Sequence, residues 1–198
     1  MKIIAIIPVK PPGEGKSRLE SALGVAERAA LSRAMFLRVL KATLDAGVEA
    51  IVVSRDADIR QQAETEGAWA LAEPEGGGLN TALDAARRFL SARGADALLV
   101  LPADLPVVDA ADVRALVLAA WSAPTVVIAP DRQDQGTNAL LLAPLDSIAF
   151  AFGPGSFERH CDAARLAGVT PTVLRRPGLT LDIDTPADLE TLQQMDRT

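Results

Sequence analysis

Short apolar runs alternate with amphipathic stretches along the whole chain, and this alternation limits the possible folds more than any other feature. The longest amphipathic stretch covers residues 26–46. Within it, Leu31, Met35 and Val39 recur at the spacing of one helical face. Gly47 follows as a residue suited to end a helix. Strands that alternate with helices predict an α/β fold with a mostly parallel sheet.

The same alternation predicts where the elements lie. We expect strands at residues 3–8, 50–53, 68–71, 97–101, 125–128, 139–142 and 172–174. We expect helices at residues 26–46, 79–93, 110–120 and 157–167, and a last helix with Thr185 as its N-cap and Pro186 in its first turn. Because no repeat, low-complexity tract or linker interrupts the pattern, residues 1–198 are predicted to form one domain.

Composition excludes several classes of protein. With 49% hydrophobic residues, 23% charged residues and a net charge of -6, the 198-residue chain is typical of a globular protein in the cytoplasm, with neither a membrane nor a nucleic acid as partner. The single cysteine, Cys161, excludes an internal disulfide and a cysteine metal cluster. The single histidine, His160, argues against zinc sites built on several histidines and against Cys-His catalysis. We expect no catalytic role for either residue.

Three carboxylates are the strongest candidates for chemistry. Asp104 and the pair Asp182 and Asp184 each follow an apolar run that predicts a buried strand. If these strands share a sheet, the acids meet at one edge. Asp182 and Asp184 are two residues apart, so on an extended segment they point to the same side. Clustered carboxylates repel one another unless a cation lies among them, so the pattern favours a divalent cation and a phosphate substrate.

Other aspartates have simpler interpretations. Asp104 taken alone is equally typical of a turn or a helix cap. Asp109 and Asp188 lie in first turns of expected helices, and we interpret both as capping residues. For Asp131 two roles stay open, a turn former and a partner of the carboxylate site.

The loop after the first expected strand carries Lys10, Lys16 and Arg18 beside Gly13 and Gly15. Lysine supplies a mobile charge, arginine a bidentate fork and glycine a closely approaching amide, a combination suited to a triphosphate. A phosphate-binding loop of the G-x-x-x-x-G-K-S type is excluded, because Lys10 stands where the first glycine would be. The alternative is a solvated basic loop.

Two further loops could bind an anion without a formal charge. Thr137 follows Gly136 at the start of an expected strand, and Gly153 precedes Ser156 at the start of an expected helix. With Ser156 as N-cap, glycine amides, a hydroxyl and the positive end of the helix would receive a carboxylate or phosphate. The alternative is a serine-capped helix after a tight turn.

These motifs together resemble one family. They are Pro8-Val9-Lys10, Lys16-Ser17-Arg18-Leu19, Leu79-Asn80, Pro102-Ala103-Asp104-Leu105-Pro106, Gly136-Thr137-Asn138-Ala139-Leu140-Leu141, Phe152-Gly153-Pro154-Gly155-Ser156-Phe157 and Asp182-Ile183-Asp184-Thr185-Pro186. The chain resembles the guanylyltransferases of deazaflavin-coenzyme biosynthesis, which act on 2-phospholactate or phosphoenolpyruvate. The resemblance implies a single-domain nucleotidyltransferase fold of the glycosyltransferase-A type, with a mixed sheet flanked by helices.

The resemblance also implies roles for individual residues. It places Mg²⁺ on Asp104, Asp182 and Asp184, and the carboxylate of the acceptor on the amides of Thr137 and Gly153 and the hydroxyl of Ser156. Residues on the GTP side are Pro8, Val9, Lys10, Lys16, Arg18, Gly78, Leu79 and Asn80, of which Lys16 and Arg18, with Asp104, would serve catalysis.

The implied reaction transfers GMP from GTP to the phosphate of a small phospho-carboxylic acid and releases pyrophosphate. Phosphoenolpyruvate is the favoured acceptor, and 2-phospholactate and 3-phosphoglycerate stay open. Two other enzymes stay open, a cytidylyl- or guanylyltransferase acting on a sugar phosphate or molybdopterin and a glycosyltransferase that holds a nucleotide-sugar. A non-catalytic nucleotide-binding module is the alternative outside enzymes. The residues do not predict the oligomeric state.

Overall fold

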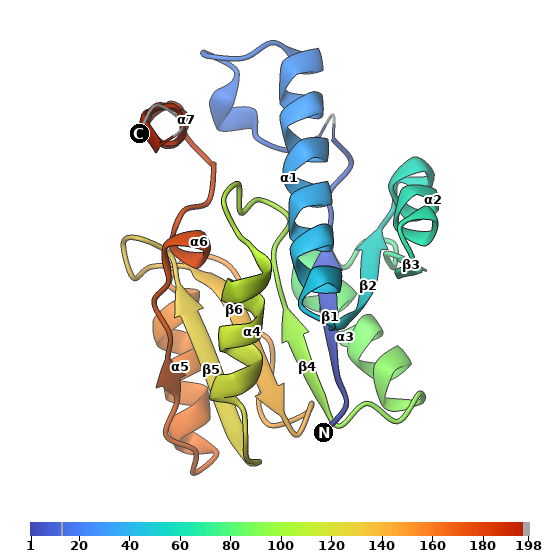
Figure 1. Ribbon diagram of the computed structural model, residues 1–198, viewed down its shortest axis with the longest axis vertical. Helices are drawn as coiled ribbons and strands as arrows, with labels where there is room; N and C mark the ends of the chain where they lie inside the picture. The colour runs from blue at the N-terminus through green and yellow to red at the C-terminus, as the bar shows by residue number, and fades with distance from the viewer. Residues whose placement is uncertain (13, 196–198) are drawn as a thin grey trace.

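A seven-stranded sheet forms the centre of the molecule, with strand order β3-β2-β1-β4-β6-β5-β7. The computed structural model describes residues 1–12 and 14–195 (Figure 1), so Gly13 of the basic loop lies outside the described residues. The strands are β1 (Ile3–Pro8), β2 (Glu49–Ser54), β3 (Trp69–Ala72), β4 (Ala97–Val100), β5 (Thr125–Pro130), β6 (Thr137–Ala143) and β7 (Thr172–Val173). The helices are η1 (Ser17–Leu19), α1 (Val25–Asp45), α2 (Ala57–Thr65), α3 (Gly78–Ser91), α4 (Ala110–Ala119), α5 (Ser156–Leu166), α6 (Pro177–Thr180) and α7 (Pro186–Met195).

The direction of the strands brings distant loops to one edge. Among the described strands, β6 alone runs against the others, because it pairs antiparallel with both β4 and β5 while the remaining pairs are parallel. The start of β6 therefore lies at the same edge as the ends of β1, β4 and β5. Ligands of open α/β sheets bind at this carboxyl edge. The sheet is mixed and mostly parallel, as predicted.

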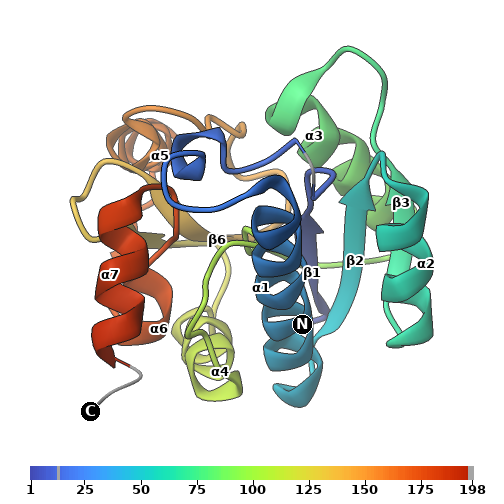
Figure 2. The same ribbon diagram turned by 90° about the horizontal axis from the view of Figure 1, so that it is seen from above.

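Helices cover both faces of the sheet (Figure 2). One apolar cluster joins α1, α2, α4 and α6 to the first face, and a second joins α3 and α5 to the other. The β1 sequence Ile-Ile-Ala-Ile-Ile-Pro is buried over its four central residues, as expected for a central strand covered on both faces. None of the helices in residues 1–12 and 14–195 has the length and apolar character required to cross a membrane.

The expected elements agree with the observed ones to within two residues at most ends. All seven expected strands are present, and α1 ends where predicted, with Gly47 at a φ of 80°. The helix expected after residue 185 is α7. Asp109 caps α4, because its carboxylate accepts the Asp112 amide at 2.9 Å. Three helices, η1, α2 and α6, had no counterpart among the helices expected from the sequence.

The prediction that a buried strand precedes Asp182 is wrong. The preceding residues form α6, and Leu181 is extended but belongs to no strand of the sheet. Pro177 at the first position of α6 favours this helical turn, since its fixed φ suits a helix start. The segment is instead held by a hydrogen bond from the Ile183 amide to the Asp104 carbonyl, at 3.3 Å.

A third, small apolar cluster fixes this segment in place. Leu181 and Ile183 are buried with Leu19 of η1 and Met35 of α1. Leu189 and Leu192 of α7 pack against the same cluster. The basic loop and the C-terminal segment are thereby joined beyond the carboxyl edge of the sheet, although more than 160 residues separate Leu19 from Ile183 in the sequence.

Gly178 in α6 lies against α4 with no room for a side chain. A Cβ atom there would lie 2.8 Å from Asp112 Cγ and 3.1 Å from Val108 Cα. The Asp112 carboxylate cannot move away freely, because it accepts the Arg176 Nε at 2.6 Å.

We therefore predict that Gly178→Ala lowers the free energy of unfolding by about 1–3 kcal/mol through overpacking. Urea denaturation monitored by circular dichroism measures this change. Gly24→Ala is the control, because a Cβ at Gly24 meets only the Glu27 carboxylate, at 3.4 Å. Equal stability of the two variants would show that α6 can shift without cost.

Candidate active site

Three carboxylates meet at the carboxyl edge of the sheet. Asp104, Asp182 and Asp184 each have an oxygen within 4.8 Å of the others. Asp104 follows β4, and Leu181 and Ile183 are buried on the opposite side of the segment that carries the two other acids. The alternation of apolar and acidic residues thus sends both carboxylates toward Asp104, as predicted from their spacing.

Lys16 supplies a cation to this cluster. Its Nζ lies 2.8 Å from Asp104 Oδ2 and 2.9 Å from Asp184 Oδ1, and only 9% of its side chain is exposed. Burial opposes the charged form of Lys16, but Asp104 and Asp184 outweigh that effect, so the pKa of Lys16 is raised. The backbone of Lys16 is left-handed, with a φ of 62°. The basic loop therefore bends sharply at the residue that enters the acid cluster.

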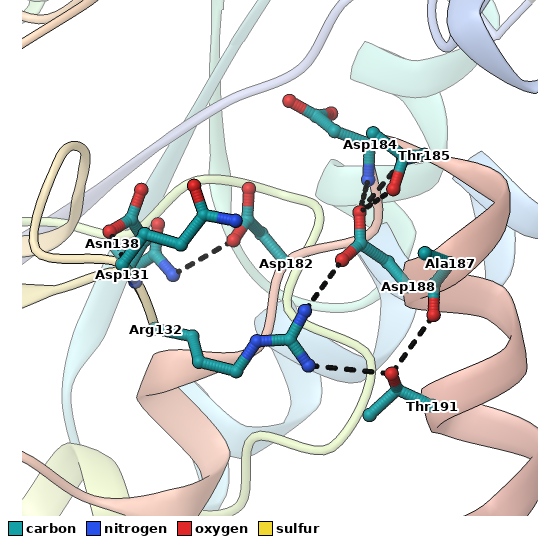
Figure 3. Close-up of polar contacts among 10 residues, drawn as sticks. Asp131, Arg132, Asn138, Asp182, Asp184, Thr185, Ala187, Asp188 and Thr191 are labelled. Atoms are coloured by element: carbon teal, nitrogen blue, oxygen red, sulfur yellow. Dashed lines mark hydrogen bonds and ion pairs between the residues drawn. The ribbon is translucent and has the colours of Figure 1, made fainter.

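Asp182 carries the clearest sign of charge crowding. Burial, followed by the proximity of Asp104, raises the pKa of Asp182 to about 6. Asn138 Nδ2 donates to Asp182 Oδ1 at 3.4 Å and partly compensates (Figure 3). An all-oxygen donor set with excess negative charge matches the ligand preference of Mg²⁺. The three acids thus fit the metal that the resemblance implies.

A pocket of about 590 Å³ opens beside the acids. The predicted nucleotide residues that line it are Pro8, Val9, Lys10, Lys16, Gly78 and Leu79, together with Asp104 and Asp184. The rest of its wall includes Glu73, Pro74 and Glu75 after β3 and Ser32 of α1. Ser32 Oγ is buried without a hydrogen-bond partner among the described residues. Sequence analysis did not identify these four residues, because none belongs to a distinctive motif.

Two predicted nucleotide residues do not line this pocket. Arg18 is an exposed residue of η1, and its contact with a triphosphate stays a prediction. Both polar atoms of the Asn80 side chain bind the backbone of Phe152. Oδ1 accepts the Phe152 amide at 2.9 Å, and Nδ2 donates to the Phe152 carbonyl at 3.1 Å. Asn80 thereby ties α3, at the pocket, to the loop that carries Gly153.

The predicted acceptor residues lie in neighbouring segments. Thr137 begins β6 and directly precedes Asn138, the partner of Asp182. Gly153 has a φ of 126°, a conformation that favours glycine, and its carbonyl accepts the Ser156 amide at 3.0 Å. The prediction that Ser156 is the N-cap is wrong. Gly155, left-handed with a φ of 69°, is the N-cap, and Ser156 is the first helical residue.

His160 is fully buried and joins the two segments predicted to bind the acceptor. Its Nδ1 lies 3.0 Å from Thr137 Oγ1, and its Nε2 accepts the Ala151 amide at 3.0 Å. Burial, followed by the nearby charge of Arg159, lowers the pKa of His160 to about 4. The imidazole is therefore neutral near pH 7.

The comparisons with known proteins decide the family. Residues 1–195 match the family described as "Guanylyl transferase CofC like". The chain belongs to the CofC-like guanylyl transferase family. A phosphoenolpyruvate guanylyltransferase of Rubrobacter xylanophilus is 45% identical over 194 residues, which cover 98% of this chain and 94% of the relative. A 2-phospho-L-lactate guanylyltransferase of Methanothermobacter thermautotrophicus is 36% identical, covering 96% and 83% of the two chains.

Solved structures agree with the nucleotidyltransferase fold. A Desulfovibrio desulfuricans protein assigned to the nucleotide-diphospho-sugar transferases superposes with a TM-score of 0.81 at 19% identity, covering 100% of this chain and 88% of the other. A nucleotidyl transferase of a Methanothermobacter species superposes with a TM-score of 0.66 at 19% identity, covering 98% and 96%. At such identities the likeness concerns the fold alone.

In this CofC-like chain, α7 is anchored by residues around the acid cluster (Figure 3). The Asp188 carboxylate accepts the amides of Asp184 and Thr185, at 3.1 and 2.8 Å, which confirms its predicted capping role. Arg132 donates to Asp188 at 3.2 Å and to Thr191 at 3.3 Å. Sequence analysis did not assign a role to Arg132, because its partners lie more than 50 residues away.

Asp131 has the role of a turn former. Its carboxylate accepts the amides of Gln133, Gln135 and Gly136 at 2.7 to 3.1 Å and closes the loop between β5 and β6. This loop leads directly into Thr137. Of the two roles left open for Asp131, the structure therefore supports the turn.

The lowered pKa of His160 predicts a pH dependence of stability. In the unfolded chain a histidine binds a proton near pH 6.5, but the folded state resists protonation until about pH 4. The unfolded state then holds more protons in that range, so the histidine contribution to the free energy of unfolding falls as pH decreases, by about 2 kcal/mol at pH 5. Asp182 has the opposite effect between about pH 6 and 3.8. Because its pKa is raised in the folded state, its contribution to the free energy of unfolding increases as pH decreases through this range.

Comparison with His160→Asn isolates the histidine contribution, since Asp182 is present in both proteins. Between pH 7.5 and pH 5 the wild-type protein should lose about 2 kcal/mol more stability than the variant in urea denaturation. Parallel pH profiles would show that the imidazole titrates normally in the fold.

Proposed function

We propose that this protein transfers GMP from GTP to the phosphate of phosphoenolpyruvate and releases pyrophosphate, as a step of deazaflavin-coenzyme biosynthesis. One observation carries the proposal, namely that Lys16 bridges two of three clustered carboxylates between a large pocket and a loop with unpaired donors. The lysine can contact a phosphate directly, and the carboxylates can hold a metal ion that contacts phosphates of both anionic substrates. Family membership and the names of the relatives at 36–45% identity support the same reaction.

The pocket side would bind GTP. Lys10 and Lys16 line the pocket and Arg18 lies on the same loop, so these cations can approach a triphosphate. Gly78 and Leu79 begin α3 and line the pocket, so the N-terminus of this helix lies beside the proposed nucleotide site. The ammonium of Lys16 would exchange its carboxylate partners for phosphate oxygens when the nucleotide binds.

The other side would bind the acceptor. Within the described residues, neither the Gly153 amide nor the Ser156 hydroxyl has a hydrogen-bond partner. Both lie at the N-terminus of α5, where the aligned backbone dipoles favour an anion. We assign the carboxylate of the acceptor to these groups and to Thr137. The phosphate of the acceptor would then point toward the acid cluster.

Asp104, Asp182 and Asp184 would hold Mg²⁺. When bound, this ion supplies the positive charge that neutralises phosphate oxygens of both substrates. Asn138 would orient Asp182, and the hydrogen bond that the Asp184 amide donates to the Asp188 carboxylate would fix the segment that bears Asp184.

The chemistry needs no general base. A phosphate monoester is mostly dianionic at neutral pH, because its second pKa is about 6, so its oxygen can attack the α-phosphorus of GTP directly. The bond from the α-phosphorus to the oxygen bridging it to the β-phosphorus breaks, and pyrophosphate leaves with that electron pair. The protein contributes alignment and charge neutralisation. This agrees with a single histidine whose ring nitrogens are both engaged in hydrogen bonds.

A competition assay tests the proposed function. The purified protein is incubated with GTP, Mg²⁺ and equal amounts of phosphoenolpyruvate, 2-phospholactate and 3-phosphoglycerate, and the products are separated by mass. We expect guanylylated phosphoenolpyruvate and an equal amount of pyrophosphate. ATP, CTP and UTP serve as control nucleotides. A main product from another nucleotide, from a sugar phosphate or from molybdopterin would replace the proposal, and no pyrophosphate release would favour a binding module.

Asp104→Asn tests the role of the acid cluster. Removing one negative charge between Lys16 and Asp182 should reduce kcat/KM by at least about a hundredfold, because the charge neutralisation at the reacting phosphates is lost. The variant should also bind Mn²⁺ more weakly in the absence of substrates, as measured by electron paramagnetic resonance.

Asp45→Asn, at the exposed end of α1, is the matched control and should retain both properties. Circular dichroism should show the same fold in the two variants. Unchanged Mn²⁺ binding by Asp104→Asn would contradict the assignment of the metal site.

A further inference from the structure

His160 contacts both segments of the proposed acceptor site from inside the protein. It lies on α5 with no exposed surface, while Thr137 belongs to β6 and Ala151 to the loop before α5. The distances are 3.0 Å from Nδ1 to Thr137 Oγ1 and 3.0 Å from Nε2 to the Ala151 nitrogen. Phe152 packs edge-on against the ring, with centroids 4.9 Å apart.

These partners determine which nitrogen carries the proton. A backbone N–H can only donate, so Nε2 must accept from Ala151 and is unprotonated. A neutral imidazole then has its proton on Nδ1, which donates to the oxygen of Thr137. The hydroxyl proton of Thr137 cannot point back to His160. It has no acceptor among the described residues, although Thr137 is only 5% exposed.

Side chains also hold the backbone of Phe152, the residue that follows Ala151 in this loop. Asn80 binds both the amide and the carbonyl of Phe152, and Arg159 Nη2 donates to the Ala151 carbonyl at 2.7 Å. The backbone of residues 151–152 is therefore fully engaged by side chains of α3 and α5. The following amide, that of Gly153, is left without a partner in the described part of the chain.

We propose that His160 is a positioning residue for the acceptor, which orients the Thr137 hydroxyl as a donor into the site and holds the loop that presents the Gly153 amide. This inference rests on the proposed function, because it identifies those donors as the binding groups for the acceptor's carboxylate. His160 acts through Thr137 and does not touch the substrate. An imidazole buried on all sides and bonded at both nitrogens has no free lone pair to serve as a base.

The three groups that we assign to the carboxylate of the acceptor carry no formal charge, and the nearby Arg159 guanidinium donates to the carbonyls of Ala151 and Pro154. Three neutral donors, the Thr137 hydroxyl, the Gly153 amide and the Ser156 hydroxyl, can hold a carboxylate only if each is already oriented toward it. Orientation in advance reduces the entropy lost on binding. A misdirected hydroxyl would instead place its lone pairs toward the carboxylate and repel it.

A double-mutant cycle tests the coupling to Thr137. His160→Leu and Thr137→Val should each raise the KM for phosphoenolpyruvate about tenfold, with the KM for GTP changed less than twofold, because each removes one oriented donor to a charged group. The KM of the double variant for phosphoenolpyruvate should exceed that of the more impaired single variant by no more than about twofold, because the effects of coupled groups are not additive. Losses that multiply, or that affect the two substrates equally, would overturn the proposal.

His160→Asn distinguishes positioning from simple packing. The asparagine amide keeps a donor near the position of Nδ1, so this variant should recover at least half of the affinity lost in His160→Leu. If His160→Leu and His160→Asn are equally impaired, the hydrogen bond to Thr137 is not responsible.

Nuclear magnetic resonance gives a readout independent of turnover. Because His160 is the only histidine, ¹⁵N-histidine labelling produces one unambiguous imidazole signal pair. We expect a protonated Nδ1 and an unprotonated Nε2 throughout pH 6–8 in the wild-type protein. An Nε2–H tautomer or an imidazolium would overturn the inference even if guanylyl transfer is observed. Absence of guanylyl transfer with the expected tautomer would instead reject the proposed function and, with it, the role toward the acceptor.

Discussion

Three carboxylates within 4.8 Å of one another remain together only because a cation and an apolar support offset their repulsion. Lys16 supplies the charge, and the buried pair Leu181 and Ile183 prevents the acidic segment from moving away. The same apolar cluster contains Leu19, three residues after Lys16. The two features that form the centre of the site therefore depend on each other, since the cluster places the lysine among the acids that it neutralises.

The two sides of the proposed site differ in the charge of the groups that would contact the substrates. Lys10 and Lys16 line the pocket proposed for the triphosphate, whereas the groups proposed to bind the carboxylate of the acceptor are neutral hydroxyl and amide donors. Asn80 and His160 join these sides mechanically, because both bind the loop at residues 151–152. In the proposed binding mode, the carboxylate of the acceptor would lie on the neutral donors and its phosphate beside the acid cluster.

The sheet brings these parts together through the reversed strand β6. If β6 ran parallel to β4, Thr137 would begin at the opposite edge, far from Asp104. Hydrophobic patterning cannot reveal this direction, because a strand buried on both faces has the same apolar composition in either direction. The α6 turn shows a similar limit, since a four-residue helix offers too short a pattern to separate it from an extended apolar run.

The sequence alone predicted the seven strands, five of the helices, the basic loop and the glycine-rich turn before α5, because each is encoded in residues close together in the chain. It also singled out the three acids, because each follows an apolar run. It also determined the family, through motifs that extend from the first strand to the last helix. Tertiary structure alone decided that Lys16 enters the acid cluster, that Asn80 binds Phe152 and that His160 joins Thr137 to Ala151. Partners in the first two pairs lie more than 70 residues apart, and the His160 contacts depend on how α5 packs on β6. Such contacts follow from packing in three dimensions, which local patterns of charge and apolarity do not specify.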